Sequence, residues 1–109
     1  MRAVTWQGKR KVSVEAVPDP GLQADTDAII EVTSTAICGS DLHLYEVLGP
    51  FMDPGDIIGH EPMGRVVEAG SASGLAVGDR VVVPFTIACG RCWMCDRKLY
   101  SQCETTQVT

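Results

Sequence analysis

The sequence predicts a mainly β domain with short helices, organised as a small barrel or sandwich. Short segments rich in Val, Ile and Thr recur along the 109 residues, and Gly, Pro and Asp clusters separate them. No long amphipathic helix, internal repeat or low-complexity linker interrupts this pattern. Many short strands at near-regular spacing are typical of all-β domains. The length suits one domain with a modest core.

The first part of the chain is expected to form a hairpin and then a strand. Residues 3–6 and 12–14 are largely apolar and are separated by a glycine turn, which favours a β-hairpin. A break rich in proline follows at residues 18–21. Residues 27–37 are rich in Ile, Val and Thr with partial alternation, which indicates a strand.

The second part is expected to contain one short helix and two short strands. Ser40-Asp41 resembles a helix N-cap, and residues 42–48 can form two helical turns after it. Val66-Val67 and residues 81–83 are predicted as short strands, linked by a glycine-containing turn.

Charge and hydropathy exclude several kinds of partner. The formal charge of −5 argues against a nucleic-acid surface, which needs clustered Lys and Arg. The longest largely apolar stretch, residues 81–89, is far too short for a membrane span, and the N-terminus does not resemble a signal peptide. We therefore expect a cytoplasmic protein in a reducing compartment, with no nucleic-acid or membrane partner.

Four of the five cysteines lie within fifteen positions, with C-x₂-C-x₂-C-x₇-C spacing. Disulfides would require an oxidising compartment, and small apolar core residues would not be this dense or have polar residues between them. Zn²⁺ favours four thiolates in a closed tetrahedron, and C-x₂-C is a common form of its ligand sets. We expect a structural zinc, which has no open position for chemistry, at Cys89, Cys92, Cys95 and Cys103.

A second group of candidate ligands surrounds the fifth cysteine. Cys38 and His60 lie 22 residues apart, and His60 precedes Glu61. One Cys, one His and an acidic neighbour suit an open catalytic zinc, at which the metal acts as a Lewis acid. Ser40 and His43 are then suited to accept the substrate proton and pass it towards solvent.

Each of these residues also has a structural interpretation. A lone Cys38 is commonly a buried apolar residue after a strand, and Ser40 is equally suited to cap a helix. Asp41 can complement the first helical turn, and His43 can be an exposed helix residue. Glu61 can support a ligand instead of binding metal itself. Spacing alone does not choose between the two interpretations.

Longer motifs resemble the zinc-containing alcohol dehydrogenases of the medium-chain dehydrogenase/reductase family. Residues 59–73 (GHEPMGRVVEAGSAS) are similar to the family's zinc signature, and residues 38–43 (CGSDLH) to its catalytic-cysteine segment. Residues 77–81 and the four cysteines follow in the family's order. The resemblance covers essentially all of residues 1–109. Neighbouring residues, including 44–45, 55–58 and 83–89, most resemble the formaldehyde-dehydrogenase-like subgroup.

The resemblance implies a GroES-like, partly open β-barrel that serves as a catalytic domain. It places the structural zinc in residues 89–103. It also implies Cys38 and His60 as catalytic-zinc ligands, with Glu61 beside the metal. By the same matching, Ser40 and His43 fall on proton-relay positions, and Asp41 steadies His60. The family reaction is reversible hydride transfer between an alcohol and NAD or NADP.

Two parts of the family pattern are missing from the sequence. There is no Gly-x-Gly-x-x-Gly fingerprint for a dinucleotide, and no third catalytic-zinc ligand follows the cysteine cluster. Residues 1–109 are therefore expected to be the N-terminal part of the catalytic domain, inactive alone, within a longer homo-oligomeric enzyme. Its substrate would be a small alcohol or aldehyde. Leu48, Phe51 and Met52 are suited to line the substrate pocket and equally suited to pack within their own loop. The alternative is a non-catalytic zinc-binding interaction module.

Overall fold

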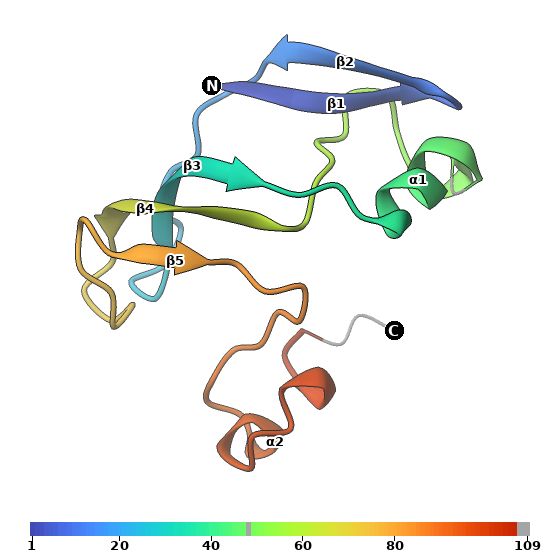
Figure 1. The fold of residues 1–109 in the computed structure, drawn as a ribbon. Coiled ribbons are helices and arrows are strands. Elements are labelled where there is room, and N and C mark those ends of the chain that lie inside the picture. The colour runs from blue at the N-terminus through green and yellow to red at the C-terminus, as the bar shows by residue number, and fades with distance from the viewer. Residues whose placement is uncertain (48, 107–109) are drawn as a thin grey trace.

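The computed structural model describes residues 1–47 and 49–106, and its strands form two antiparallel sheets (Figure 1). One sheet is the hairpin β1–β2, and the other has the strand order β3-β4-β5. Within the described residues the sheets do not close into a barrel. The mainly β class predicted from the sequence is confirmed. Leu48, expected near a substrate pocket, lies outside the described residues.

The N-terminal hairpin pairs β1 (Arg2–Gly8) with β2 (Lys11–Ala16). Its turn needs left-handed backbone: Gly8 has a φ of 140° and Arg10 a φ of 60°. The paired register shifts between Trp6 and Gly8, which is typical of a bulge beside a glycine turn. Thr5 is fully buried and bridges to Ile57, so the hairpin is connected to the loop that leads into β4.

The second sheet has β4 (Pro62–Ala69) at its centre, between β3 (Ala28–Thr35) and β5 (Arg80–Val82). The sequence predicted a strand only at Val66-Val67, because glycine and charged residues surround that pair. The glycine and charged residues nevertheless belong to β4, because β4 pairs with β3 on one side and with β5 on the other. A Cβ at Gly64 would lie 2.3 Å from the Glu31 carbonyl oxygen, so this close approach of backbones requires glycine.

Helix α1 (Gly39–Glu46) begins where β3 has ended, and it is short and solvent-facing. Its N-cap is Cys38, so the prediction of Ser40 as the cap is wrong. The Asp41 carboxylate accepts a hydrogen bond from the Cys38 N–H at 2.9 Å. Because this bond completes a capping box at Cys38, the N-cap lies two residues before the predicted Ser40. A 3₁₀ turn, η1 (Gly49–Phe51), follows.

The last part of the chain folds as a separate protrusion below the sheet (Figure 1). It contains α2 (Trp93–Asp96) and the 3₁₀ turn η2 (Tyr100–Gln102). We call residues 89–103 the four-cysteine lobe. Two of its cysteines, Cys95 and Cys103, are buried although few other side chains are.

The described residues bury few large side chains. Trp6 and Val66 are the buried apolar residues of the sheets, whereas many other large apolar residues are exposed. The radius of gyration is 15.5 Å, above the roughly 13 Å of a compact domain of this length. Extensive apolar exposure is typical of a domain that packs against further protein surface. Among the helices that the structure describes, none combines the length and apolarity needed to cross a bilayer.

Candidate functional site

The four-cysteine lobe brings its sulfur atoms together. The Sγ atoms of Cys89, Cys92, Cys95 and Cys103 all lie within 4.8 Å of one another, and all four are free thiols. Cys95 and Cys103 are buried, and the other two are half-buried. Four thiols at this separation, without a disulfide, match the donor set that zinc prefers for a closed site.

Backbone N–H groups of the lobe point at its sulfur atoms. The Cys95 N–H donates to Cys92 Sγ at 3.4 Å, and the Cys89 N–H donates to Cys103 Sγ at 3.3 Å. Cys92 is also the N-cap of α2, which places its sulfur at the positive end of that turn. Such donors stabilise negative charge on sulfur.

The two buried thiols of the lobe have opposite acid–base properties. The Thr106 side chain and the Cys89 N–H stabilise the thiolate of Cys103 and lower its pKa to about 5. Burial raises the pKa of Cys95 to about 11. A divalent cation would favour the thiolate at both positions, so the donor set fits a zinc ion.

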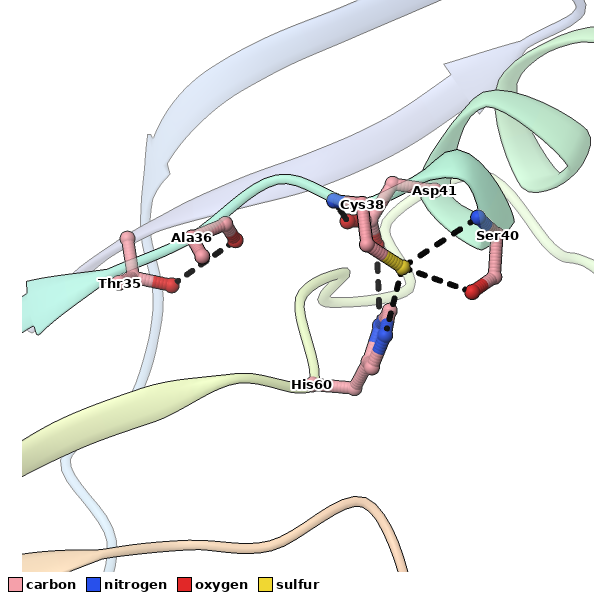
Figure 2. Close-up of polar contacts among 6 residues, drawn as sticks. All are labelled: Thr35, Ala36, Cys38, Ser40, Asp41 and His60. Carbon is pink, nitrogen blue, oxygen red and sulfur yellow. Dashed lines mark hydrogen bonds and ion pairs between the residues drawn. The ribbon is translucent and has the colours of Figure 1, made fainter.

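A second cluster joins the start of α1 to the loop before β4, and we call its residues Cys38, Asp41 and His60 the Cys38–His60 centre. Their ligand atoms lie within 4.8 Å of one another. Figure 2 shows the His60 ring facing both of the other side chains, which lie together at the start of α1. Its Nε2 lies 3.1 Å from Cys38 Sγ, and its Nδ1 lies 3.1 Å from Asp41 Oδ1. All three residues are half-buried, so the cluster is open to approach.

Asp41 connects the helix cap to the imidazole. Its Oδ2 accepts the Cys38 N–H, and its Oδ1 is buried with His60 Nδ1 as its nearest partner, although the two are poorly aligned for a hydrogen bond. A carboxylate beside one ring nitrogen directs the other towards a metal. The orientation of His60 therefore fits a metal at Nε2, next to the Cys38 sulfur.

Ser40 lies directly beside the Cys38 sulfur. Its hydroxyl Oγ is 2.8 Å from Cys38 Sγ, and its backbone N–H donates to the same sulfur at 3.3 Å (Figure 2). The contact with the Ser40 hydroxyl, and to a smaller extent the one with the Ser40 N–H, lowers the pKa of the Cys38 thiol from its usual value of 9.0. The sulfur therefore has thiolate character, which a metal ligand needs.

The charge environment acts on His60 in two directions. Burial lowers the pKa of His60, but the Cys38 contact and then the Asp41 carboxylate outweigh burial and raise its pKa above 6.5. Charge from Glu61 adds to this effect. Surrounding negative groups of this kind favour a cation at the ring, either a proton or a metal ion.

The structure places the remaining predicted residues around this centre rather than in it. His43 is exposed on α1, three residues after Ser40 and thus on a neighbouring helix surface. Within the described residues, the Glu61 carboxylate is not among the donors that come within 4.8 Å. Its carbonyl oxygen accepts the Ala36 N–H at 3.4 Å, which holds the loop beside β3.

Phe85 is a site residue that the sequence did not indicate. Its ring stands edge-on to the His60 ring, with centroids 5.6 Å apart and planes at 73°. The Phe85 side chain is 76% exposed, so it forms an apolar wall at the open side of the centre. The only indication in the sequence was an aromatic residue in the loop between β5 and the lobe. Its position in the sequence did not show that it would contact His60.

Comparison with known proteins shows the family to which the chain is related. Residues 24–109 match the family model described as the alcohol dehydrogenase GroES-like domain. A zinc-type alcohol dehydrogenase-like protein of Bacillus subtilis is 55% identical over 105 residues, covering 95% of this chain and 28% of the relative. A formaldehyde dismutase of Pseudomonas putida is 43% identical, covering 98% of this chain and 28% of the relative.

The chain therefore belongs to the alcohol dehydrogenase family, through its GroES-like domain. An alcohol dehydrogenase of Thermus sp. ATN1 superposes with a TM-score of 0.84 at 45% identity, over 95% of this chain and 30% of that one. The family resemblance and the GroES-like fold are thus confirmed, and the dismutase agrees with the predicted subgroup. The chain spans less than a third of the length of these relatives.

Proposed function

We propose that these residues form the N-terminal part of the catalytic domain of a zinc-dependent alcohol or aldehyde oxidoreductase. The observation that carries the proposal is that His60 lies beside both Cys38 and Asp41. One ring nitrogen lies 3.1 Å from the sulfur, and the other lies 3.1 Å from the carboxylate. That arrangement has the ligand chemistry and the supporting carboxylate of a metal-bound histidine.

Zinc would be held by Cys38 and His60, and it would supply Lewis acidity that lowers the pKa of a hydroxyl group near it. Asp41 holds the His60 ring and acts as a positioning residue. Glu61 provides negative charge next to the site. A third protein ligand would come from outside the described residues.

The proton leaves through residues of this chain. Ser40, whose Oγ lies 2.8 Å from the Cys38 sulfur, accepts the hydroxyl proton of the alcohol as it passes its own proton on. His43, exposed on the same helix, delivers that proton to solvent. Bound NAD or NADP would supply the acceptor for the hydride that the alcohol carbon loses on oxidation.

The substrate would approach past Phe85. Its exposed ring stands beside His60 and gives one side of the open centre an apolar surface. Phe51 is likewise exposed, at 82%, and is available for an apolar pocket formed with further residues. A small alcohol or aldehyde is the substrate class that suits such a wall.

The four-cysteine lobe would hold a second, structural zinc. Nicotinamide binding would need residues other than 1–109, so these residues alone would be inactive. The whole enzyme is proposed to be a cytoplasmic homo-oligomer.

A second candidate function, a zinc-binding interaction module, is favoured by one feature of the lobe. Trp93 is 55% exposed, and the Arg97 guanidinium stacks 3.7 Å from its ring centroid. An exposed aromatic with a stacked cation suits a protein contact. This module would need only the lobe zinc, whereas the oxidoreductase needs both metals.

The test measures zinc content and alcohol-dependent NAD(P)H formation by the enzyme that contains these residues. The proposal expects two zinc ions in the wild type, one tight and one removable by a chelator. Cys38→Ala should lose the removable ion and all turnover while keeping the tight one. One zinc per chain in the wild type, or full turnover by Cys38→Ala, would overturn the proposal.

A further inference from the structure

Helix α1 and its N-cap carry two of the three residues of the Cys38–His60 centre, Cys38 and Asp41, yet few contacts of the helix itself fix its orientation. It has eight residues and no buried side chain. Isolated helices of this length are marginal in water. Its orientation must therefore come from contacts at its two ends.

Side-chain packing against the hairpin does not fix the position of α1. A hollow of about 450 Å³ separates them, lined by Val4 and Val12 of the hairpin and by Leu42 and Tyr45 of α1. The N-terminal end of α1 is fixed by the capping box of Cys38 and Asp41, which is part of the candidate site itself. A helix held only there can pivot about its cap.

Arg10 connects the hairpin turn to the other end of α1. Its backbone N–H donates to the Tyr45 carbonyl oxygen at 2.8 Å, which its left-handed φ of 60° makes possible. Its guanidinium donates from Nε to Glu46 Oε2 at 2.5 Å and from a terminal nitrogen to Glu46 Oε1. This fork geometry fixes direction as well as distance.

We propose that Arg10 is a positioning residue that clamps the C-terminal end of α1, so that Asp41 stays beside His60 in the metal centre. An eight-residue helix is about 12 Å long, so a clamp at Glu46 limits the pivot of the first turn. The role rests on the proposed function, because it matters only if Cys38 and His60 bind zinc. The proposal gives the hairpin turn a role in metal binding, although the turn contacts the end of α1 that is opposite to the metal centre.

The experiment is a zinc titration against a chromogenic chelator, which resolves the tight and the removable ion. Arg10→Asn removes the guanidinium, and Asn tolerates the left-handed backbone. We expect the dissociation constant of the removable zinc to rise about three-fold, as for an exposed bidentate pair. The tight zinc should not change. Lys11→Met, which removes an equal charge from the same hairpin, should leave both constants unchanged.

Two further variants separate positioning from general stability. Glu46→Gln should reproduce the effect of Arg10→Asn, and the swapped pair Arg10→Glu with Glu46→Arg should restore the wild-type constant. Loss of global stability would instead weaken both zinc sites together. Two zinc ions in the wild type with no change in Arg10→Asn and Glu46→Gln would overturn the clamp alone. A single zinc in the wild type would overturn the proposed function first.

Discussion

The four-cysteine lobe and the Cys38–His60 centre are built in opposite ways. The lobe takes four sulfur donors from fifteen consecutive residues, and two of them are buried. The Cys38–His60 centre joins residues 22 apart, from the cap of α1 and the loop before β4, and all of its members are half-buried. The lobe encloses its donors, whereas the centre leaves them open on the side that Phe85 lines.

This difference suits the two separate roles that we propose for zinc in this chain. A set of four protein ligands stabilises a loop and excludes other ligands. A set of fewer ligands leaves a coordination position free, but its geometry then depends on supporting residues such as Asp41. The lobe should therefore be sensitive to loss of a ligand, and the centre should also be sensitive to loss of residues that touch no metal.

Loss of a lobe cysteine should have the largest effect. Cys103→Ser should lower the affinity of the lobe for its tight zinc by more than about 100-fold. Loss of a residue that only supports a ligand lowers metal affinity by up to about 100-fold, and loss of a ligand itself should cost more. Zinc titration and hydrogen exchange across residues 89–103 measure this. Ser101→Ala, in the same turn, serves as the control. Equal zinc affinity in the two variants would contradict the assignment of the lobe.

Ser40→Ala should have the second largest effect, and it should lower turnover without changing zinc binding. Without the hydroxyl beside Cys38, turnover should fall about 100-fold, the lower end for a missing proton-transfer group. Both zinc constants should stay within about two-fold, since the Ser40 N–H remains a donor to the sulfur. Steady-state kinetics with Ser34→Ala as the control provides the measurement. Wild-type turnover would exclude Ser40 from the relay.

Asp41→Asn tests the supporting residue. The amide oxygen can still accept the Cys38 N–H, but the charge beside His60 Nδ1 is lost. The removable zinc should bind about 10-fold more weakly, the lower end of the range for partners of metal-bound histidines. Asp27→Asn removes an equal charge from a turn in which Asp27 accepts the Gln23 and Ala24 N–H groups. If the two variants have the same zinc affinity, Asp41 does not orient His60.

The smallest effect concerns acid stability at the hairpin. The Arg10 hydrogen bond and then its charge, with a contribution from Lys9, lower the pKa of Glu46 below 4.5. A carboxyl with a lowered folded pKa contributes stability that is complete above its ordinary pKa and is lost as the pH falls through the folded value. Urea unfolding below pH 4.5 should therefore show a slightly shallower pH dependence for Arg10→Asn than for the wild type. A steeper dependence would contradict this sign.

The sequence predicted what is local or carried by longer motifs. The hairpin follows from its apolar segments and glycine turn, and the clustering of the lobe cysteines follows from their spacing. Bringing Cys38 next to His60 needed the family resemblance, because two ligands in different loops have no characteristic spacing. The β3–β4 pairing that brings them together is a non-local property of the sheet.

Other features depended on contacts that no pattern reveals. Cysteine is not a usual N-cap, so Ser40 was expected at that position, whereas the Asp41 carboxylate selects Cys38 as the cap. Phe85 reaches His60 because the segment after β5 passes the open side of the site. The pairing of Arg10 with Glu46 joins residues 36 apart through a left-handed turn. Each of these depends on the tertiary arrangement of short elements.

The most direct test of the central claim is an anomalous-scattering map at the zinc edge from crystals grown with zinc. We expect two peaks per chain, one among the four lobe sulfurs and one within about 2.3 Å of Cys38 Sγ and about 2.1 Å of His60 Nε2. A map with a peak in the lobe and none between Cys38 and His60 would contradict it.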